Sequence, residues 1–95
     1  MEAPQVGDST RLSNDFKDVD GVLTDPTTIV LKVKDPSGTT DVYTYASAQV
    51  ERDATGQYHR DIAIDEPGTW HWRWEGAGAI VAVDEDFFYV TRSAF

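Results

Sequence analysis

The chain has 95 residues, no cysteine and a formal net charge of −9, from 17 acidic and 8 basic residues. This length suits one domain with a single core. Without cysteine, neither disulfides nor thiolate chemistry is available to it. An acidic chain repels phosphate backbones and anionic lipid surfaces, so we expect binding to neither nucleic acid nor membranes. The charge most simply serves solubility, and attraction of a basic partner is the alternative.

The N-terminus carries no targeting signal. Its first ten residues, MEAPQVGDST, contain no basic segment followed by an apolar one. No apolar run in the chain reaches the roughly 20 residues of a membrane span. We therefore expect a protein made in the cytoplasm without a signal peptide. This expectation does not hold if the sequence is a piece of a longer exported protein.

Short segments of alternating polarity, separated by turn signals, follow one another along the chain. DPSG at 35–38 and DEPG at 65–68 are two such turns. No segment keeps a helical period for more than two turns. The pattern predicts an all-β antiparallel sandwich or barrel of about seven strands. The expected strands lie near residues 8–17, 27–34, 39–45, 49–53, 57–64, 68–76 and 79–91, with an interruption or bulge at 84–86.

All three tryptophans, Trp70, Trp72 and Trp74, occupy alternate positions of the segment GTWHWRWEG. Strand side chains alternate between faces, so the tryptophans share one face while His71 and Arg73 share the other. Because His71 and Arg73 are polar, their face should be in contact with water. The tryptophans should then face the core, where each buries roughly 200 Å² of surface. The alternative is an aromatic platform for carbohydrates or bases, which would leave charged residues buried behind it.

Four segments, GDSTRLSNDFKDVDG, TTIVLKVKDPSGTTDVYTY, ATGQYHRDIAIDEPGTWHWRWEG and FFYV, resemble a bacterial immunoglobulin-like domain. They resemble more closely the small immunoglobulin-like proteins encoded among the virion genes of tailed phages and prophages. The resemblance covers about residues 7–90. It implies one immunoglobulin-like β-sandwich over residues 1–95, without a disulfide and with a corner aromatic at Trp70. Its strands B, C, E, F and G would be 8–17, 28–34, 57–64, 68–76 and 79–91, and residues 1–6 a short A strand or arm.

Two inward positions of the expected strands are polar: Asn14 on the first and Arg60 on the fifth. A buried arginine needs paired acceptors. Asn14 and a carboxylate of the 79–91 segment would serve as such acceptors. Alternatively, Arg60 lies near a sheet edge and extends its guanidinium to solvent.

The sequence shows no catalytic, cofactor or metal motif, so we expect no enzyme and no cofactor. His59 and His71 fall on different strands, whereas a zinc site needs three or four ligands close together. No serine lies in a nucleophile elbow, and no glycine-rich loop opens a helix. DVDG at 18–21 is like the start of an EF-hand loop, but Ile29 stands where that loop needs glutamate. Calcium binding by Asp18 and Asp20 with another loop stays an open alternative.

An outward-facing surface is the best functional candidate. Inward Trp72 and Phe88 force their strand neighbours outward, and strand 28–34 lies beside them in this architecture. Aromatics with arginine and few acids are typical of interface centres. We expect Phe87, Tyr89 and Arg73 at the centre of a docking face, and Lys32, Lys34 and His71 at its rim with Val30, facing an acidic or polar partner.

The resemblance implies a structural protein of a phage virion. It would decorate the capsid, or sit at the head–tail junction or in the tail, with other virion proteins or further copies of itself as partners. The alternative is an adhesion or carbohydrate-binding module of a longer surface protein. That alternative requires an upstream export signal and, for sugar binding, exposed aromatics.

The assignment of faces can be tested by two neighbouring substitutions. Trp72→Ala should lower the free energy of unfolding by about 3–5 kcal/mol, as large-to-small changes in cores do. His71→Ala should change it by no more than about 0.5 kcal/mol, as surface changes do. Denaturant unfolding measures both, and equal costs would break the assignment.

Overall fold

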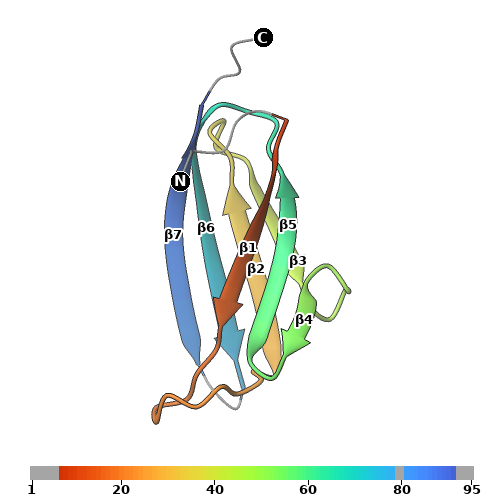
Figure 1. Cartoon of the computed structure of the whole chain (residues 1–95), viewed down its shortest axis with the longest axis vertical. Helices are drawn as coiled ribbons and strands as arrows, with labels where there is room; N and C mark the ends of the chain where they lie inside the picture. Colours follow the sequence, from red (N-terminus) through yellow and green to blue (C-terminus); the bar gives the residue numbers. More distant parts are fainter. Residues whose placement is uncertain (1–6, 79–80, 92–95) are drawn as a thin grey trace.

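Two antiparallel sheets packed face to face make up the structure, a computed structural model that describes residues 7–78 and 81–91 (Figure 1). One sheet has the strand order β1-β5-β4 and the other β3-β2-β6-β7. The predicted all-β sandwich is therefore confirmed. The expected strand or arm at residues 1–6 lies outside the described residues. The seven strands of the described chain are β1 (Ser9–Asp15), β2 (Thr28–Lys34), β3 (Thr40–Thr44), β4 (Glu51–Ala54), β5 (Gln57–Ala63), β6 (Gly68–Ala77) and β7 (Ala82–Val90).

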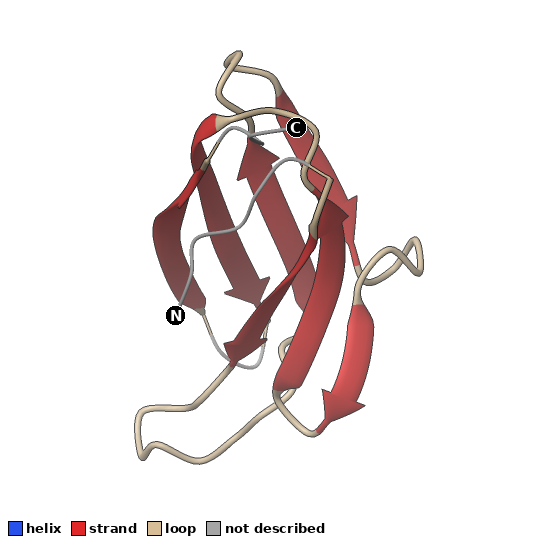
Figure 2. Cartoon of the chain, turned by 45° about the horizontal axis from the view of Figure 1, so that its top comes forward, coloured by secondary structure: helices blue, strands red, loops and turns tan. Residues whose placement is uncertain are grey.

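The two sheets form separate layers (Figure 2). Within the four-stranded sheet, β6 pairs with β2 on one side and with β7 on the other. The expected adjacency of the 28–34, 68–76 and 79–91 segments is thus confirmed for their described residues. Strand β7 lies at the edge of its sheet, as β3 does at the opposite edge.

Strand β7 runs without a break through Asp84, Glu85 and Asp86, so the predicted interruption at 84–86 was wrong. Each of these acids keeps a partner on β6 in one continuous register. All three side chains are exposed. An edge strand leaves its charged side chains in reach of water, so this acidic stretch needs no bulge.

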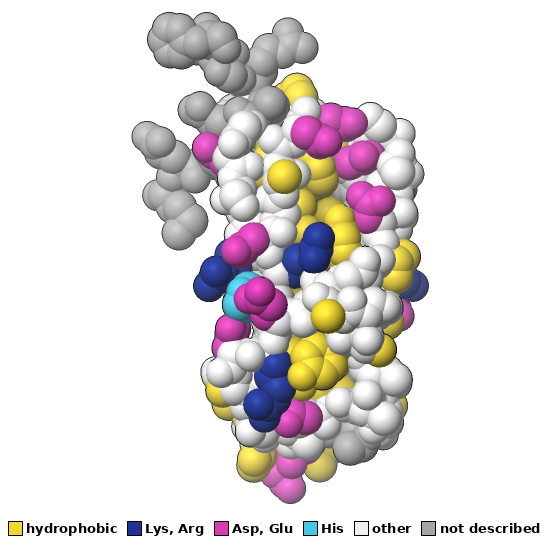
Figure 3. All heavy atoms as spheres, turned by 90° about the vertical axis from the view of Figure 1, so that its right-hand side faces the viewer, with side chains coloured by type: hydrophobic (Ala, Val, Ile, Leu, Met, Phe, Trp, Pro, Cys, Tyr) yellow, Lys and Arg dark blue, Asp and Glu magenta, His cyan; other side chains and the backbone are white. Residues whose placement is uncertain are grey.

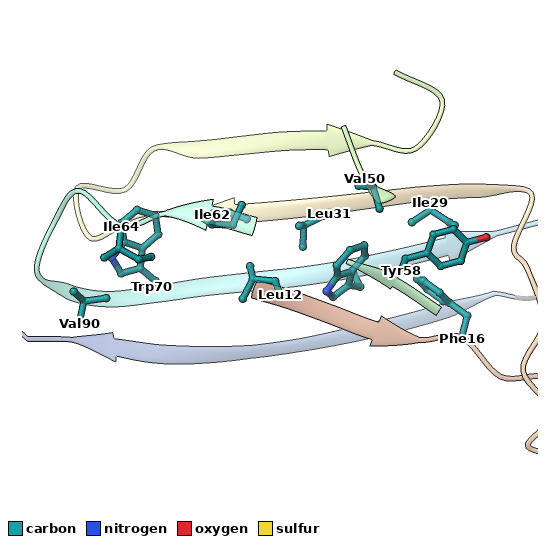
Figure 4. Close-up of a cluster of buried hydrophobic side chains, with 12 residues drawn as sticks. Leu12, Phe16, Ile29, Leu31, Val50, Tyr58, Ile62, Ile64, Trp70 and Val90 are labelled. Atoms are coloured by element: carbon teal, nitrogen blue, oxygen red, sulfur yellow. The ribbon is translucent and has the colours of Figure 1, made fainter. Parts of the chain in front are cut away.

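The core fills the space between the sheets (Figure 4). It is built from alternate strand positions, as a period of two requires. In β2, for example, Ile29, Leu31 and Val33 are buried while the residues between them face outward. The complete cluster consists of Leu12, Phe16, Ile29, Leu31, Val33, Val50, Tyr58, Ile62, Ile64, Trp70, Trp74 and Val90.

The tryptophans face inward, as predicted, but they are not equally buried. Trp74 is 0% exposed and Trp70 is 5% exposed, whereas Trp72 is only partly buried against the core. Trp72 lies opposite Asp86 of the edge strand, an exposed aspartate, so water reaches this part of the inner face. The indole N–H of Trp70 donates to the carbonyl of Glu66 at 3.0 Å, which ties β6 to the turn before it.

The loop at 16–27 is tied to the three-stranded sheet by the carboxylate of Asp25. This carboxylate accepts hydrogen bonds from the Tyr58 hydroxyl at 2.7 Å and the Gly56 amide at 2.8 Å, and the Arg52 guanidinium binds both of its oxygens. The Arg52 hydrogen bond, followed by that of Gly56, holds the pKa of Asp25 well below its usual range. Burial, together with the bond to Asp25, raises the pKa of Tyr58 to about 12.

The first arrangement predicted for Arg60, with Asn14 and a carboxylate as acceptors, is not found. Strand β4 pairs with β5 only as far as His59, so Arg60 lies beyond the end of β4, at an open edge of the sheet, and is partly exposed. Its guanidinium lies 3.8 Å from the ring centre of Tyr43 on β3 and donates to the carbonyl of Gln49 at 2.6 Å, which links the two sheets. Asn14 donates instead to Asp84 at 3.1 Å.

Figure 3 views the β3 and β4 side, where hydrophobic side chains form a lengthwise strip with basic and acidic ones beside it.

Trp74→Ala, rather than Trp72→Ala, should be the costly tryptophan substitution. Emptying the fully buried site should lower the free energy of unfolding by about 3–5 kcal/mol. Trp72→Ala should cost less, because water already reaches this side chain, and His71→Ala should stay within about 0.5 kcal/mol. Urea denaturation of the three variants gives the ranking. A Trp72→Ala loss as large as that of Trp74→Ala would contradict the difference in burial.

Alkaline pH should destabilise the protein through Tyr58. Its folded pKa of about 12 exceeds the roughly 10 of an unfolded tyrosine. The stabilisation from this group is therefore fully present below about pH 10 and is lost as pH rises through about 12. Tyr58→Phe should flatten this part of the pH dependence of unfolding. Parallel curves for wild type and Tyr58→Phe would contradict the raised pKa.

Candidate docking face

The outer face of the four-stranded sheet, which points away from the core, carries the residues that the sequence predicts to meet a partner. Strand register arranges them in rows across β2, β6 and β7. One row, here called the docking row, joins Lys34, His71 and Phe87. The next row joins Lys32, Arg73 and Glu85, and Tyr89 follows Phe87 along β7 beside Thr69.

The two predicted aromatic residues are well exposed. Phe87 is 62% exposed and Tyr89 is 59% exposed, and both belong to edge strand β7. The rings of Phe87 and His71 have their centres 6.0 Å apart, tilted by 45°. The backbone N–H of Phe87 donates to the Asp86 carboxylate at 2.8 Å, which steadies the strand at this point. Apolar surface is therefore available beside a polar ring.

A depression of about 430 Å³ opens on the outer face. It brings together most of the predicted docking residues, from three different strands. Its lining is mixed, with cations, acids and the Phe87 ring, and it lies over the docking row and the row beside it. The lining residues are Lys32, Lys34, His71, Trp72, Arg73, Glu85, Asp86 and Phe87.

Acidic residues also lie on this face, where Glu75 and Glu85 share it with the cations. One oxygen of Glu75 lies 3.0 Å from the Lys32 ammonium and 3.0 Å from Nε of Arg73. Arg73 also reaches Glu85 at 3.7 Å. Such exposed pairs stabilise a fold by only about 0–1 kcal/mol. Their consequence here is electrostatic, since Lys32 and Arg73 are largely neutralised by neighbours of their own chain.

Lys34 and His71 differ from these paired cations. Within the described residues, neither makes an ion pair, and both side chains are exposed. The Phe87 ring lies next to His71, with 6.0 Å between the two ring centres. The unpaired positive charge of the face is thus concentrated in the docking row.

Val30 belongs to another part of the sheet. It is partly buried, lies beside Glu75 on β6 and Thr44 on β3, and lines a separate hollow with Tyr45. Val30 and Lys34 are four positions apart along β2, which corresponds to about 13 Å. Strand alternation puts Val30 on the predicted outer face of the sheet, and the register places it two rows away from Phe87.

The remaining acidic clusters have structural partners. The His59 ring, 5% exposed, lies between Glu51 at 2.8 Å and Asp53 at 2.7 Å and links β5 to β4. The Asp18 carboxylate accepts two backbone N–H groups of its own loop, at 2.9 and 3.0 Å. No group of three or more metal-binding side chains comes together in the described part of the chain. The sequence indicates that His59 shares a face with acids, but not that it is buried between them.

Comparison with known proteins gives no relative from which a role for these residues can be taken. No protein-family model matches the chain, and no curated protein matches it. A search of residues 7–78 and 81–91 for a helix able to span a membrane finds none. The geometry of the outer face and the sequence resemblance therefore carry the functional inference.

Proposed function

We propose that this protein is a non-enzymatic interaction module that docks onto a larger assembly through the outer face of β2, β6 and β7. The observation that carries the proposal is the exposure of Phe87 and Tyr89, 62% and 59%, beside a depression lined by Lys34, which has no ion pair in the described part of the chain. Exposed aromatics next to cations are the residues on which interface energy concentrates. Docking of this kind is static and involves no turnover.

The finer form of the proposal is an accessory protein of a tailed-phage particle. It would act as capsid decoration, or as a component of the head–tail junction or the tail, with other virion proteins or further copies of itself as partners. Two features support it: the resemblance of four segments of the chain to small immunoglobulin-like phage proteins, and the two-sheet sandwich that the resemblance implies. Purified particles that lack the protein would contradict this form.

The competing sugar-binding module loses its strongest basis, because Trp70 and Trp74 are buried and cannot stack on a ligand. The genes that flank the coding sequence separate the two classes. Neighbouring genes for virion components support the accessory protein. An export signal upstream in the same reading frame supports a surface protein instead.

Replacement of Phe87 and Tyr89 together by serine should abolish docking without unfolding the protein. Both side chains are exposed on an edge strand, so thermal unfolding should stay close to that of the wild type. Buried aromatic anchors each contribute about 2 kcal/mol or more to an interface, so co-sedimentation with particles, or self-association, should be lost.

A matched control removes exposed apolar surface from another part of the molecule. Val19 and Val22, on the loop at 16–27, are 102% and 57% exposed. Their double replacement by serine should leave docking unchanged. If this control loses docking while the Phe87/Tyr89 variant keeps it, the contact lies in the acidic loop around Asp18 and Asp20 rather than on the sheet.

A further inference from the structure

We propose that the docking row is a carboxylate-recognition site, in which Lys34 and His71 hold an acidic side chain of a partner protein against the Phe87 ring. This inference rests on the proposed docking function and specifies the chemistry of the partner. The occupant is an acidic segment that carries an apolar or aromatic residue next to its carboxylate.

The row beside the docking row cannot supply the recognition charge. Its two cations, Lys32 and Arg73, form ion pairs with two acids, Glu75 and Glu85. The nitrogen–oxygen distances in these pairs are 3.0 to 3.7 Å. Two positive and two negative charges sum to zero. Lys34 has no such partner among the described residues, so a carboxylate that enters the depression meets a single free ammonium.

The docking row also has suitable geometry and donors. Side chains directly opposite on neighbouring strands have Cβ atoms about 4.5–5.5 Å apart. Lys34 therefore stands next to His71, and His71 stands next to Phe87, with 6.0 Å between the two ring centres. An ammonium offers three N–H donors, and an imidazole offers at least one in either tautomer. One carboxylate can thus receive hydrogen bonds from both, with a phenyl ring beside its aliphatic part.

Charge complementarity selects an acidic occupant over a basic one. A lysine or arginine placed in the depression would lie next to Lys34, while the rest of this protein, with a net charge of −9, would attract it elsewhere. The long-range repulsion of an acidic partner is screened beyond about 8–10 Å at physiological salt. Contact at the docking row is then governed by Lys34 and His71. The Asp86 carboxylate also borders the depression, but Asp86 pairs with Trp72 and so belongs to the other face of β7 from Phe87.

The first test uses a short blocked peptide in which glutamate alternates with glycine and phenylalanine, and a second peptide with glutamine in place of glutamate. Amide chemical shifts of the ¹⁵N-labelled full chain are followed during titration. The glutamate peptide should shift the amides of Lys34, His71 and Phe87 and bind about tenfold or more tightly than the glutamine peptide, as a charged hydrogen-bond partner implies. Equal affinities, or shifts confined to other strands, would overturn the proposal.

The second test compares two charge reversals that alter the net charge equally. Lys34→Glu removes the proposed ligand, and Lys17→Glu makes the same change at an exposed lysine of the loop at 16–27. Lys34→Glu should weaken the glutamate peptide about tenfold or more. Lys17→Glu should weaken it by less than about twofold, because screening removes distant charges. Equal weakening would show that only the overall field matters and would overturn the site.

Two further arms separate the possible failures. Glucuronate should bind more weakly than the glutamate peptide, and tighter binding would assign the carboxylate to an acidic carbohydrate and overturn a protein occupant. If the Phe87/Tyr89 serine variant loses docking while both peptides bind alike, carboxylate recognition fails and the docking face stands. If that variant docks normally and the peptides bind alike, both proposals fail.

Discussion

Edge-to-face packing of Phe16 joins the two sheets of this cysteine-free sandwich. Its ring centre lies 5.7 Å from that of Tyr58 in one sheet and 6.3 Å from that of Trp74 in the other. Two glycines make room for it. At Gly76 a Cβ would come within 2.9 Å of the Phe16 ring, and at Gly56, where φ is +73°, within 2.7 Å of the Phe16 carbonyl oxygen. Such aromatic contacts add to area burial, and the positions of both sheets depend on them.

Alternation of polarity predicts which face of each strand is buried. It does not predict which residues of neighbouring strands lie side by side. The inward positions of Trp70 and Trp74 follow from a period of two, because a strand has only two faces. The pairing of Glu75 with Lys32 depends on the register between β2 and β6, which loop geometry and packing set together. The partial exposure of Trp72 likewise depends on its position opposite an edge strand, which a single sequence does not show.

The same alternation couples the core to the docking face. In β6 each inward tryptophan fixes an outward neighbour, so His71 and Arg73 are presented by a strand that hydrogen bonds on both sides. Phe87 and Tyr89 are presented by the edge strand β7. The acidic stretch at 84–86 places charge on that edge, a common protection against unwanted strand pairing. In the docking that we propose, a partner would therefore meet the face of this sheet rather than its β7 edge.

Charges on this protein act at two ranges. The net charge of −9 repels acidic partners through solvent, and salt screens this repulsion. Lys34 instead interacts with groups in direct contact with it. Repulsion over most of the surface disfavours encounters with acidic partners in wrong orientations, and like charges brought together at an interface are costly. Lys34, which has no ion pair within residues 7–78 and 81–91, would relieve that cost where the proposed partner touches the docking row. In the docking that we propose, the contrast between Lys34 and its acidic surroundings would select the orientation of an acidic partner, while burial of Phe87 and Tyr89 would contribute most of the affinity.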